Sequence, residues 1–304
     1  MEEPTELATM EKNRDALSDP RLWSHWIRKE PIWNRARHIT MGIDAGSTYT
    51  KGVVMFDGEL DASLGLSIGS LNPDCSQIIF SSLTHLLNIP PEKINVVIGT
   101  GYGRVHAPMA MRTVTEVSCH TRGAIFLYGA QVRTIVDVGG QDIKAIRCNE
   151  KGKVTNFILN DKCAAGTGRG LEALAERLDI PLHKFGLKFL SEEDAEAPLS
   201  NSCMFFLKDE CIRLLREGWR TEQIEDAVCR FTAEHIQAVV KRAGVEAHLV
   251  VTGGLAKNTG VMQRLSVLLG RPFPHPQGDP QFAGAIGAAI YGQVLCQKGK
   301  TGKR

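Results

Sequence analysis

Short apolar runs that end in glycine-rich turns are the clearest pattern along most of the chain. In residues 38–59, two apolar runs flank a small polar turn, which predicts a β-hairpin. Residues 133–148 repeat this order, with an apolar run, Asp137, a glycine turn, Lys144 and a second apolar run. Because the same arrangement surrounds Asp44, we expect two similar halves.

The remaining pattern predicts an α/β protein. Helices are expected at 76–87, at 121–129, over most of the chain after residue 166, and at 282–296, with buried strands at 94–98 and 248–254. The last helix lies in a charge-free segment, 280–297, whose glycines suit close packing against protein rather than lipid. We therefore expect it to be buried.

The expected organisation has five parts. They are an N-terminal extension (1–38), a first domain (39–134), a second domain (135–279), a helix that packs back on the first domain (280–297) and a basic tail (298–304). The extension contains Trp23, Trp26 and Trp33 among many charges. Because the spacing of Trp23 and Trp26 fits one face of a helix, we expect an arm that docks on the main body or on a partner.

Composition and charge narrow the class of protein. Of 304 residues, 36 are Lys or Arg and 34 are Asp or Glu, which leaves a net charge of +2. This balance argues against nucleic acid or an anionic membrane as the main partner. The acidic, polar N-terminus does not read as a signal peptide, so we expect a cytoplasmic protein whose eight cysteines are mostly reduced thiols.

The first turn carries groups suited to Mg²⁺ and a phosphate. Asp44 ends the apolar run, and a carboxylate there can hold Mg²⁺, which prefers oxygen ligands. Gly46 lets the backbone approach a phosphate, and Ser47 and Thr48 can donate hydrogen bonds to its oxygens. Lys51 can reach the same phosphates as a point charge. We expect these five residues to bind a Mg-nucleotide.

The second turn carries a related set. Gly139 and Gly140 leave backbone N–H groups uncovered for a phosphate. Asp137 is a candidate catalytic residue that can share the metal. Gln141 or Asp142 can orient the attacking water, so these three are the predicted catalytic residues.

A third turn follows an apolar run late in the chain. Gly253 and Gly254, shortly before Asn258, would allow a base or ribose to lie against the backbone. Together the three turns predict a nucleotide clamped between two related domains, and they resemble the actin-like (RNase H-like) fold of sugar kinases, Hsp70-type chaperones and actin. The segment GTGYGR imitates a dinucleotide fingerprint, but its glycines are wrongly spaced for G-x-G-x-x-G.

A cysteine-containing segment points to one family. Residues 160–169, NDKCAAGTGR, together with SNSC at 200–203, resemble the activators of 2-hydroxyacyl-CoA dehydratases and the ATPase subunits of benzoyl-CoA reductase, the BadF/BadG/BcrA/BcrD-type ATPases. The three turns, GTGYGR and the pair Glu116 and His120 match this family too. The resemblance covers residues 39–296.

The resemblance implies that Cys163 and Cys203 ligate a [4Fe–4S] cluster shared with a second, homologous subunit. Such a cluster commonly takes four thiolates, so two subunits with two cysteines each complete the set. Both cysteines precede expected helices, whose positive ends favour the thiolate form. Cys211 is not expected to be a ligand, because eight helical residues would place it about 12 Å along the axis from Cys203.

The activity implied by the resemblance is ATP-driven delivery of one low-potential electron to a catalytic partner, with ferredoxin as donor. Shifting an electron by several hundred millivolts costs on the order of ten kcal/mol, at about 2.3 kcal/mol per 100 mV, so coupling to ATP is reasonable. The bulky stretch after Cys203, MFFLKDE, differs from the dehydratase activators. It favours a benzoyl-CoA reductase subunit, which serves anaerobic aromatic degradation.

Three other interpretations stay open. A homodimeric activator of a 2-hydroxyacyl-CoA dehydratase would have the same chemistry and a different partner. A small-molecule kinase of the same fold would need a catalytic Asp beside a substrate site and no cluster. A non-enzymatic nucleotide switch or assembly protein would bind clients or polymerise according to its nucleotide. The cysteine motif argues against the last two.

Overall fold

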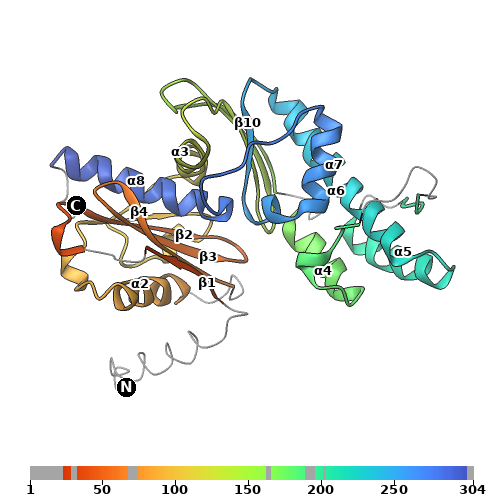
Figure 1. Ribbon diagram of the computed structural model, residues 1–304, viewed down its shortest axis with the longest axis horizontal. Coiled ribbons are helices and arrows are strands. Elements are labelled where there is room, and N and C mark those ends of the chain that lie inside the picture. Colours follow the sequence, from red (N-terminus) through yellow and green to blue (C-terminus); the bar gives the residue numbers. More distant parts are fainter. Residues whose placement is uncertain are drawn as a thin grey trace, which may run out of the picture. The chain divides into compact units, whose positions relative to one another are not determined.

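The computed structural model describes residues 23–28, 33–67, 74–161, 166–188, 196–200 and 203–299 (Figure 1). The chain divides into two compact units, of which unit 1 is Met1–Gly123 with Phe282–Arg304 and unit 2 is Ala124–Gln281. The first division falls earlier than the expected boundary after residue 134. The reason is that helix α3 (Glu116–Tyr128) begins in unit 1 and ends in unit 2.

A six-stranded sheet of the order β1-β4-β3-β2-β5-β6 forms the centre of unit 1. Its strands are β1 (Trp23–Ile27), β2 (Ile39–Ala45), β3 (Thr50–Phe56), β4 (Glu59–Leu66), β5 (Val96–Thr100) and β6 (Arg112–Thr113). Strands β2, β3 and β4 are antiparallel neighbours, and β5 runs parallel to β2. The predicted hairpin is confirmed, and it continues into a third strand.

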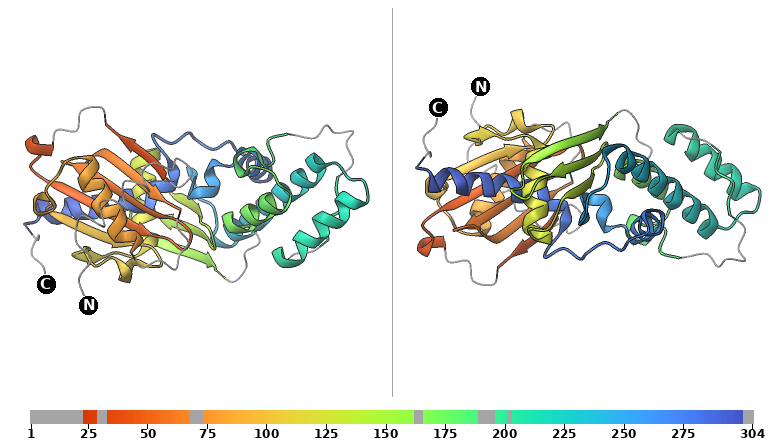
Figure 2. Two further views of the ribbon diagram at one scale, coloured as in Figure 1. Left: turned by 90° about the horizontal axis from the view of Figure 1, so that it is seen from below. Right: turned by 90° about the horizontal axis from the view of Figure 1, so that it is seen from above.

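Helices cover both faces of this sheet, as the two views of Figure 2 show. Helix α2 (Cys75–Leu86) packs Ile79 and Leu83 against β3 on one face. Helix α8 (Ala283–Gln297) lies on the other face, where a Cβ added to Gly42 of β2 would be 1.9 Å from the carbonyl oxygen of Ala285. The many Ala and Gly residues of α8 allow this close approach.

A four-stranded sheet of the order β10-β7-β8-β9 forms the centre of unit 2. Its strands are β7 (Thr134–Val138), β8 (Ile143–Cys148), β9 (Val154–Asn160) and β10 (Leu249–Thr252). Strands β7, β8 and β9 are antiparallel neighbours, and β10 runs parallel to β7. Because β2, β3, β4 and β5 are arranged in the same way, the predicted repeat is confirmed.

The helices of unit 2 pack on one face of its sheet. They are α4 (Gly168–Arg177), α5 (Met204–Arg216), α6 (Thr221–Ala243) and α7 (Thr259–Leu269). Val136, Ile143 and Val251 of the sheet share a buried core with apolar side chains of these helices. Among the residues described, no helix combines the length and apolar composition that a membrane crossing requires.

The N-terminal arm forms a strand where the spacing of Trp23 and Trp26 predicted a helix. β1 pairs antiparallel with β4, with Trp23 opposite Leu66 and Ile27 opposite Ala62. A spacing of three in so short a segment does not distinguish helix from strand, and the edge of β4 offers hydrogen-bonding groups for a strand. The prediction of a helical arm is therefore wrong.

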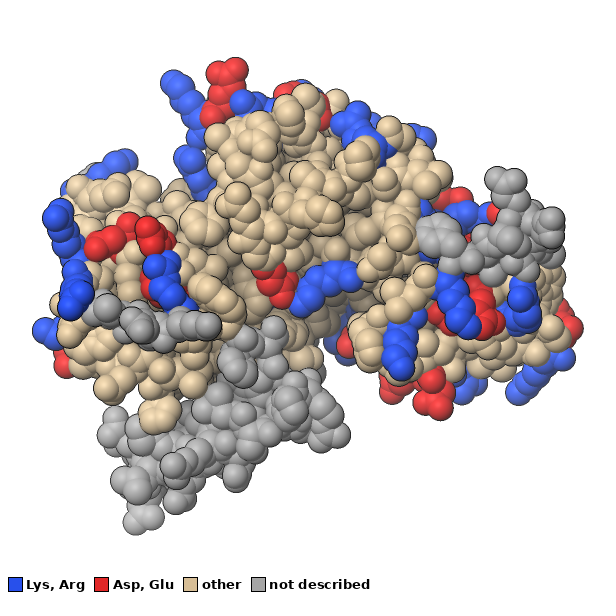
Figure 3. All heavy atoms as spheres, viewed as in Figure 1, with Lys and Arg blue, Asp and Glu red and all other residues tan. Residues whose placement is uncertain are grey.

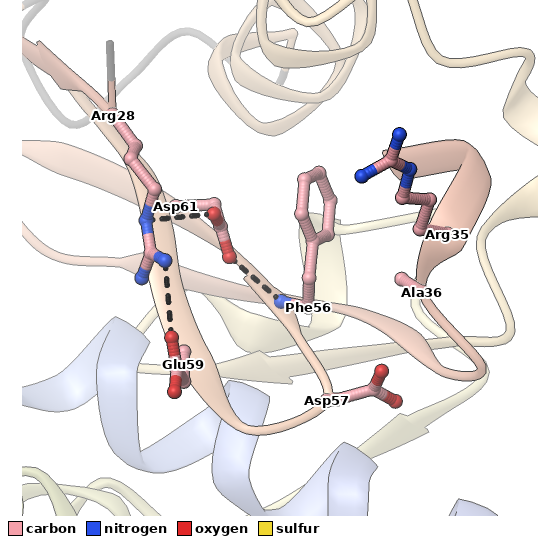
Figure 4. Close-up of a pocket in the computed structure, with 7 residues that line it drawn as sticks. All are labelled: Arg28, Arg35, Ala36, Phe56, Asp57, Glu59 and Asp61. Carbon is pink, nitrogen blue, oxygen red and sulfur yellow. Dashed lines mark hydrogen bonds and ion pairs between the residues drawn. The ribbon is translucent and has the colours of Figure 1, made fainter. Parts of the chain in front are cut away.

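An ion pair fastens the arm beyond β1 (Figure 4). Arg28 Nε lies 3.0 Å from Asp61 Oδ1, and Arg28 Nη1 lies 3.0 Å from Glu59 Oε2. Burial raises the pKa of the Asp61 carboxyl, although the Phe56 N–H group and the Arg28 charge oppose this shift. Trp33 packs against the core of unit 1. The described part of the arm therefore docks on the main body, beside a cavity of about 250 Å³.

Candidate functional site

Asp44 lies at the end of β2, between the two neighbouring strands. It is opposite Lys51 of β3 and Thr100 of β5, so the three side chains share one face of the sheet. The residue is 2% exposed, and Lys51 Nζ lies 2.7 Å from Asp44 Oδ2. The lysine offsets the cost of burying this carboxylate.

Asp137 occupies the equivalent place in unit 2, opposite Lys144 of β8 and Thr252 of β10. It is also 2% exposed, and Thr252 Oγ1 donates a 3.0 Å hydrogen bond to its Oδ1. Lys144 Nζ lies 3.6 Å from Asp137 Oδ2 but 2.7 Å from Asp142 Oδ2. Two carboxylates therefore share the charge of one buried lysine.

Each threonine is followed by a glycine that the geometry requires. Gly101 has a φ of 89° and Gly253 a φ of 88°, which other residues rarely adopt. A Cβ at Gly101 would lie 2.4 Å from Asp44 Oδ1, and a Cβ at Gly253 would lie 2.3 Å from the carbonyl oxygen of Val138. Thr100 and Gly101 are missing from the predicted site, although the same Thr-Gly pair follows an apolar run at both places.

The first turn folds back over its own lysine. A Cβ at Gly46 would lie 3.2 Å from Lys51 Nζ. The predicted phosphate-binding residues beside it, Ser47 and Thr48, are half-buried. The N–H group of Gly103 donates a 2.8 Å hydrogen bond to the carbonyl oxygen of Ala45, so the GTGYGR loop supports the turn. These residues of the first predicted set therefore lie close to one another.

The second turn is joined to the start of α4. The N–H group of Gly139 donates a 3.0 Å hydrogen bond to the carbonyl oxygen of Asp142, which closes the turn between β7 and β8. The carbonyl oxygens of Gly139 and Gly140 accept hydrogen bonds from the N–H groups of Gly168, at 3.0 Å, and Arg169, at 2.9 Å. Helix α4 therefore begins directly on the predicted phosphate turn.

The third turn follows β10 and leads into α7. After Gly253, the residues Gly254–Lys257 form a 3₁₀ turn. Asn258 caps α7, because its Oδ1 accepts a 2.8 Å hydrogen bond from the N–H group of Val261. Its Nδ2 donates to the carbonyl oxygen of Phe185 at 3.1 Å. The Asn258 amide thus has structural partners, and its contact with a nucleotide stays a prediction.

The two predicted cluster ligands differ in what can be described. Cys203 is an exposed cysteine and lies directly before α5, as its N-cap. The segment before it is held by α5, because Ser200 donates to Glu210 Oε1 from its N–H group, at 3.0 Å, and from its Oγ, at 2.5 Å. Cys163 lies outside the described residues.

The other cysteines are buried. Burial raises the pKa of Cys119, Cys211 and Cys229 to about 12, and it also raises the pKa of Cys75 and Cys296. The thiolate is the form that binds a metal, so this environment disfavours these side chains as ligands. The burial of Cys211 agrees with its exclusion from the predicted ligand set.

The side chains suit a Mg-nucleotide better than a metal ion held by protein alone. Mg²⁺ typically takes one or two carboxylates and completes its shell with phosphates and water. Asp44 and Asp137 each supply one buried carboxylate beside a glycine turn. Within the described ranges, no group of three or more His, Cys, Asp or Glu side chains could hold a metal. For an iron–sulfur cluster, the fitting feature is the exposed Cys203 thiol at the positive end of α5.

Charge is mixed on the surface that Figure 3 shows. Lys and Arg side chains alternate with Asp and Glu across this face, without an extended basic region. This pattern agrees with the net charge of +2. It offers no support for nucleic-acid binding.

Comparison with known proteins gives the class of fold and then the family. The predicted fold class, α/β with two actin-like domains, is confirmed by the solved structures that the chain resembles. A model of the BadF/BadG/BcrA/BcrD ATPase family matches residues 41–292. The chain belongs to this family, and the arm with β1 lies before the matched region.

Individual relatives narrow the similarity. The activator of lactoyl-CoA dehydratase from Anaerotignum propionicum is 37% identical, over 85% of this chain and 99% of its own length. The solved activator of the 2-hydroxyisocaproyl-CoA dehydratase from Clostridium difficile, with bound ADPNP, has a TM-score of 0.79 at 33% identity, over 86% of this chain and 97% of that chain. A benzoyl-CoA reductase subunit from Thauera aromatica is 28% identical, over 86% of this chain and 95% of its own length. Similarity therefore favours the dehydratase activators, contrary to the expectation drawn from MFFLKDE.

Proposed function

We propose that this chain is the ATP-hydrolysing activator of a 2-hydroxyacyl-CoA dehydratase, to which it delivers single electrons at low potential. The observation that carries the proposal is the repeated turn of buried Asp, Lys, Thr and Gly, in a chain whose relatives at 37% and 33% identity are dehydratase activators. Two such turns match the need of ATP for a metal and for several phosphate contacts.

The first turn is assigned to Mg²⁺ and phosphate. Asp44 would hold Mg²⁺ directly or through water, because its carboxylate ends a strand beside an open glycine turn. Lys51 would bind phosphate oxygens, and Ser47 and Thr48 would donate hydrogen bonds to them. On phosphate binding, Lys51 would share its charge between the phosphate and Asp44.

The second turn is assigned to phosphate and to the attacking water. Gly139 and Gly140 would offer N–H groups to phosphate oxygens, with Asp137 near the metal. Asp142 is the stronger candidate for orienting water, because its carboxylate is 26% exposed while it contacts the buried Lys144. Gln141 is the other candidate. Gly253, Gly254 and Asn258 are assigned to the ribose or base.

Hydrolysis would be coupled to the cysteine segments through α4. The carbonyl groups of Gly139 and Gly140 hold the first N–H groups of α4, so a shift of this turn would displace the helix. Helix α4 follows the segment that contains Cys163, and α5 follows Cys203. Rigid helices of this kind transmit small displacements.

The cysteines are assigned to a [4Fe–4S] cluster. Cys163 and Cys203 would supply half of its ligands, and a second copy of the chain would supply the rest. The cluster carries one electron when bound. Reduced ferredoxin is the proposed donor, and the dehydratase is the proposed acceptor.

A subunit of a benzoyl-CoA reductase is the second candidate. The observation that favours it is Phe206, which is 57% exposed in the stretch after Cys203. A large apolar side chain at this place suits packing against a non-identical subunit. This candidate keeps the ATP and cluster residues and changes the partner and the final acceptor.

The deciding experiment measures iron, sulfide and ATP hydrolysis on anaerobically purified protein. We expect about four irons per dimer, lost in Cys163→Ser and Cys203→Ser but kept in the control Cys296→Ser. Transfer is then assayed with a 2-hydroxyacyl-CoA dehydratase and with a benzoyl-CoA reductase. Activation of the reductase alone would move the assignment to the second candidate. Iron-free protein, alone and with a co-expressed homologue, would overturn the electron-transfer role.

A further inference from the structure

His120 and Asp44 face the same small space inside unit 1. His120 lies on α3 and is 5% exposed. A Cβ added to Gly284, at the start of α8, would lie 2.9 Å from His120 Nε2 and 2.6 Å from Asp44 Oδ2. Both polar atoms are therefore within 3 Å of one point, which stays open because residue 284 has no side chain.

The equivalent carboxylate in unit 2 shows what is missing around Asp44. Asp137 accepts a hydrogen bond from Thr252, a neutral donor on the parallel strand. Thr100 has the same register position beside Asp44, but no hydrogen bond joins the two side chains in the described part of the chain. The Thr100 hydroxyl is instead a neighbour of the Cys119 thiol.

We propose that His120 is a positioning residue that orients the Asp44 carboxylate, in the role that Thr252 has for Asp137. Two groups then fix Asp44 Oδ2, Lys51 on β3 and the imidazole on α3. The inference rests on the proposed function, because the orientation matters when Asp44 holds Mg²⁺. It gives a role to the histidine of EVSCHTRGA, for which the sequence suggested none.

The physical reason is that a metal ligand must present its lone pairs in a fixed direction. A carboxylate held by a single ammonium group can rotate about its Cβ–Cγ bond, because the ammonium is a point charge without directional demand. A second group on another element removes this freedom. Residues that orient a metal ligand in this way typically account for about 10- to 100-fold in metal affinity or activity.

The test separates metal binding from folding. We expect His120→Ala to bind Mg²⁺ with a non-hydrolysable ATP analogue about 10- to 100-fold more weakly than wild type, measured by calorimetry. The same titration in EDTA should give an unchanged affinity for the metal-free analogue. His120→Gln should recover most of the loss, because its amide places an N–H donor near the position of Nε2. His85→Ala, an exposed histidine on α2, is the control.

Gly284→Ala provides an independent test that leaves both polar groups in place. The added methyl group would occupy the space between His120 and Asp44, so we expect the same loss of Mg²⁺-dependent affinity. Wild type that binds no Mg-nucleotide would overturn the proposed function itself. Wild type that binds, with His120→Ala and Gly284→Ala equal to it, would overturn only the role of His120. Equal losses with and without Mg²⁺ would show a packing role and would also overturn it.

Discussion

Asp44 and Asp137 occupy the same place in two sheets of the same topology, yet the lysines beside them behave differently. Lys51 contacts Asp44 at 2.7 Å, whereas Lys144 lies 2.7 Å from Asp142 and 3.6 Å from Asp137. The strands fix the shared framework, since register sets which residues face each other. The turn decides where the charge goes, and only the second turn places a partly exposed carboxylate beside the lysine. We infer that the first turn serves the metal and the second serves the water.

The edges of the two sheets differ as well. In unit 1 the arm covers β4 with β1, whereas the equivalent strand β9 ends its sheet. Phe157 and Leu159 of β9 are 47% and 41% exposed. An uncovered edge with apolar side chains is a place where other chains can pair. The duplicated framework has thus been completed in unit 1 by a segment that lies outside the region matched to the family.

The largest effects should come from the two aspartates. We expect Asp44→Asn and Asp137→Asn each to lower the kcat/KM for ATP by about 10²- to 10³-fold, because each removes a charge that supports the transition state. The comparison predicts different causes. Asp44→Asn should raise the Mg²⁺ concentration needed for half-maximal rate, and Asp137→Asn should mainly lower kcat. Steady-state rates over a Mg²⁺ series test this.

The control for both is Asp179→Asn, an exposed aspartate with a φ of 55° that Asn also tolerates. Loss of the same kinetic parameter in both site variants would remove the proposed division between metal and water.

Asp142→Asn should have a smaller effect. Without its charge, Lys144 is free to move towards Asp137, and the proposed contact with water is weakened. We expect kcat to fall about 10- to 100-fold, with the affinity for the nucleotide nearly unchanged. Gln141→Ala is the matched variant in the same turn. A larger loss in Gln141→Ala than in Asp142→Asn would transfer the water to Gln141.

Local features of both turns could be predicted from the sequence, because an apolar run, an Asp and a glycine turn are adjacent in the chain. The alignment of Thr100 with Asp44 depends on a parallel pairing between distant segments, and no local pattern encodes that register. The approach of His120 to Asp44 requires α3 and α8 to pack together, so it was also hidden. The arm was misread because three-residue spacing of tryptophans in a short segment fits a strand as well.

The two glycines with positive φ test whether the framework is equally tight in both units. We expect Gly101→Ala and Gly253→Ala each to lower the free energy of unfolding by at least about 2–3 kcal/mol, from an unfavourable φ and from contact with Asp44 Oδ1 or with the Val138 carbonyl oxygen. Gly270→Ala is the control, with a φ of 64° and open space around it, and should cost about 1 kcal/mol. Chemical denaturation followed by circular dichroism measures the differences. Equal costs at all three positions would show that the contacts around the aspartates are loose.

The smallest effect should come from Arg28, which fastens the arm that only unit 1 has. Burial raises the pKa of the Asp61 carboxyl, so the folded protein keeps this proton at a pH where the unfolded chain has lost it. Stability contributed by Asp61 therefore falls as pH rises from the ordinary aspartate pKa through the raised one. Because Arg28 attracts only the ionised form, Arg28→Ala should cost little below this window and about 0.5–1 kcal/mol above it.

Asp61→Asn supplies the matched background for this last measurement. With no ionisable group at 61, Arg28→Ala should have the same effect on the free energy of unfolding at every pH across the window, and the double-mutant cycle isolates the ion pair. Half-exposed Arg28 limits the size of the effect, since water screens it. A cost of Arg28→Ala that does not change with pH in the wild-type background would show that β-strand pairing and the packing of Ile27 hold the arm, and that the ion pair contributes nothing.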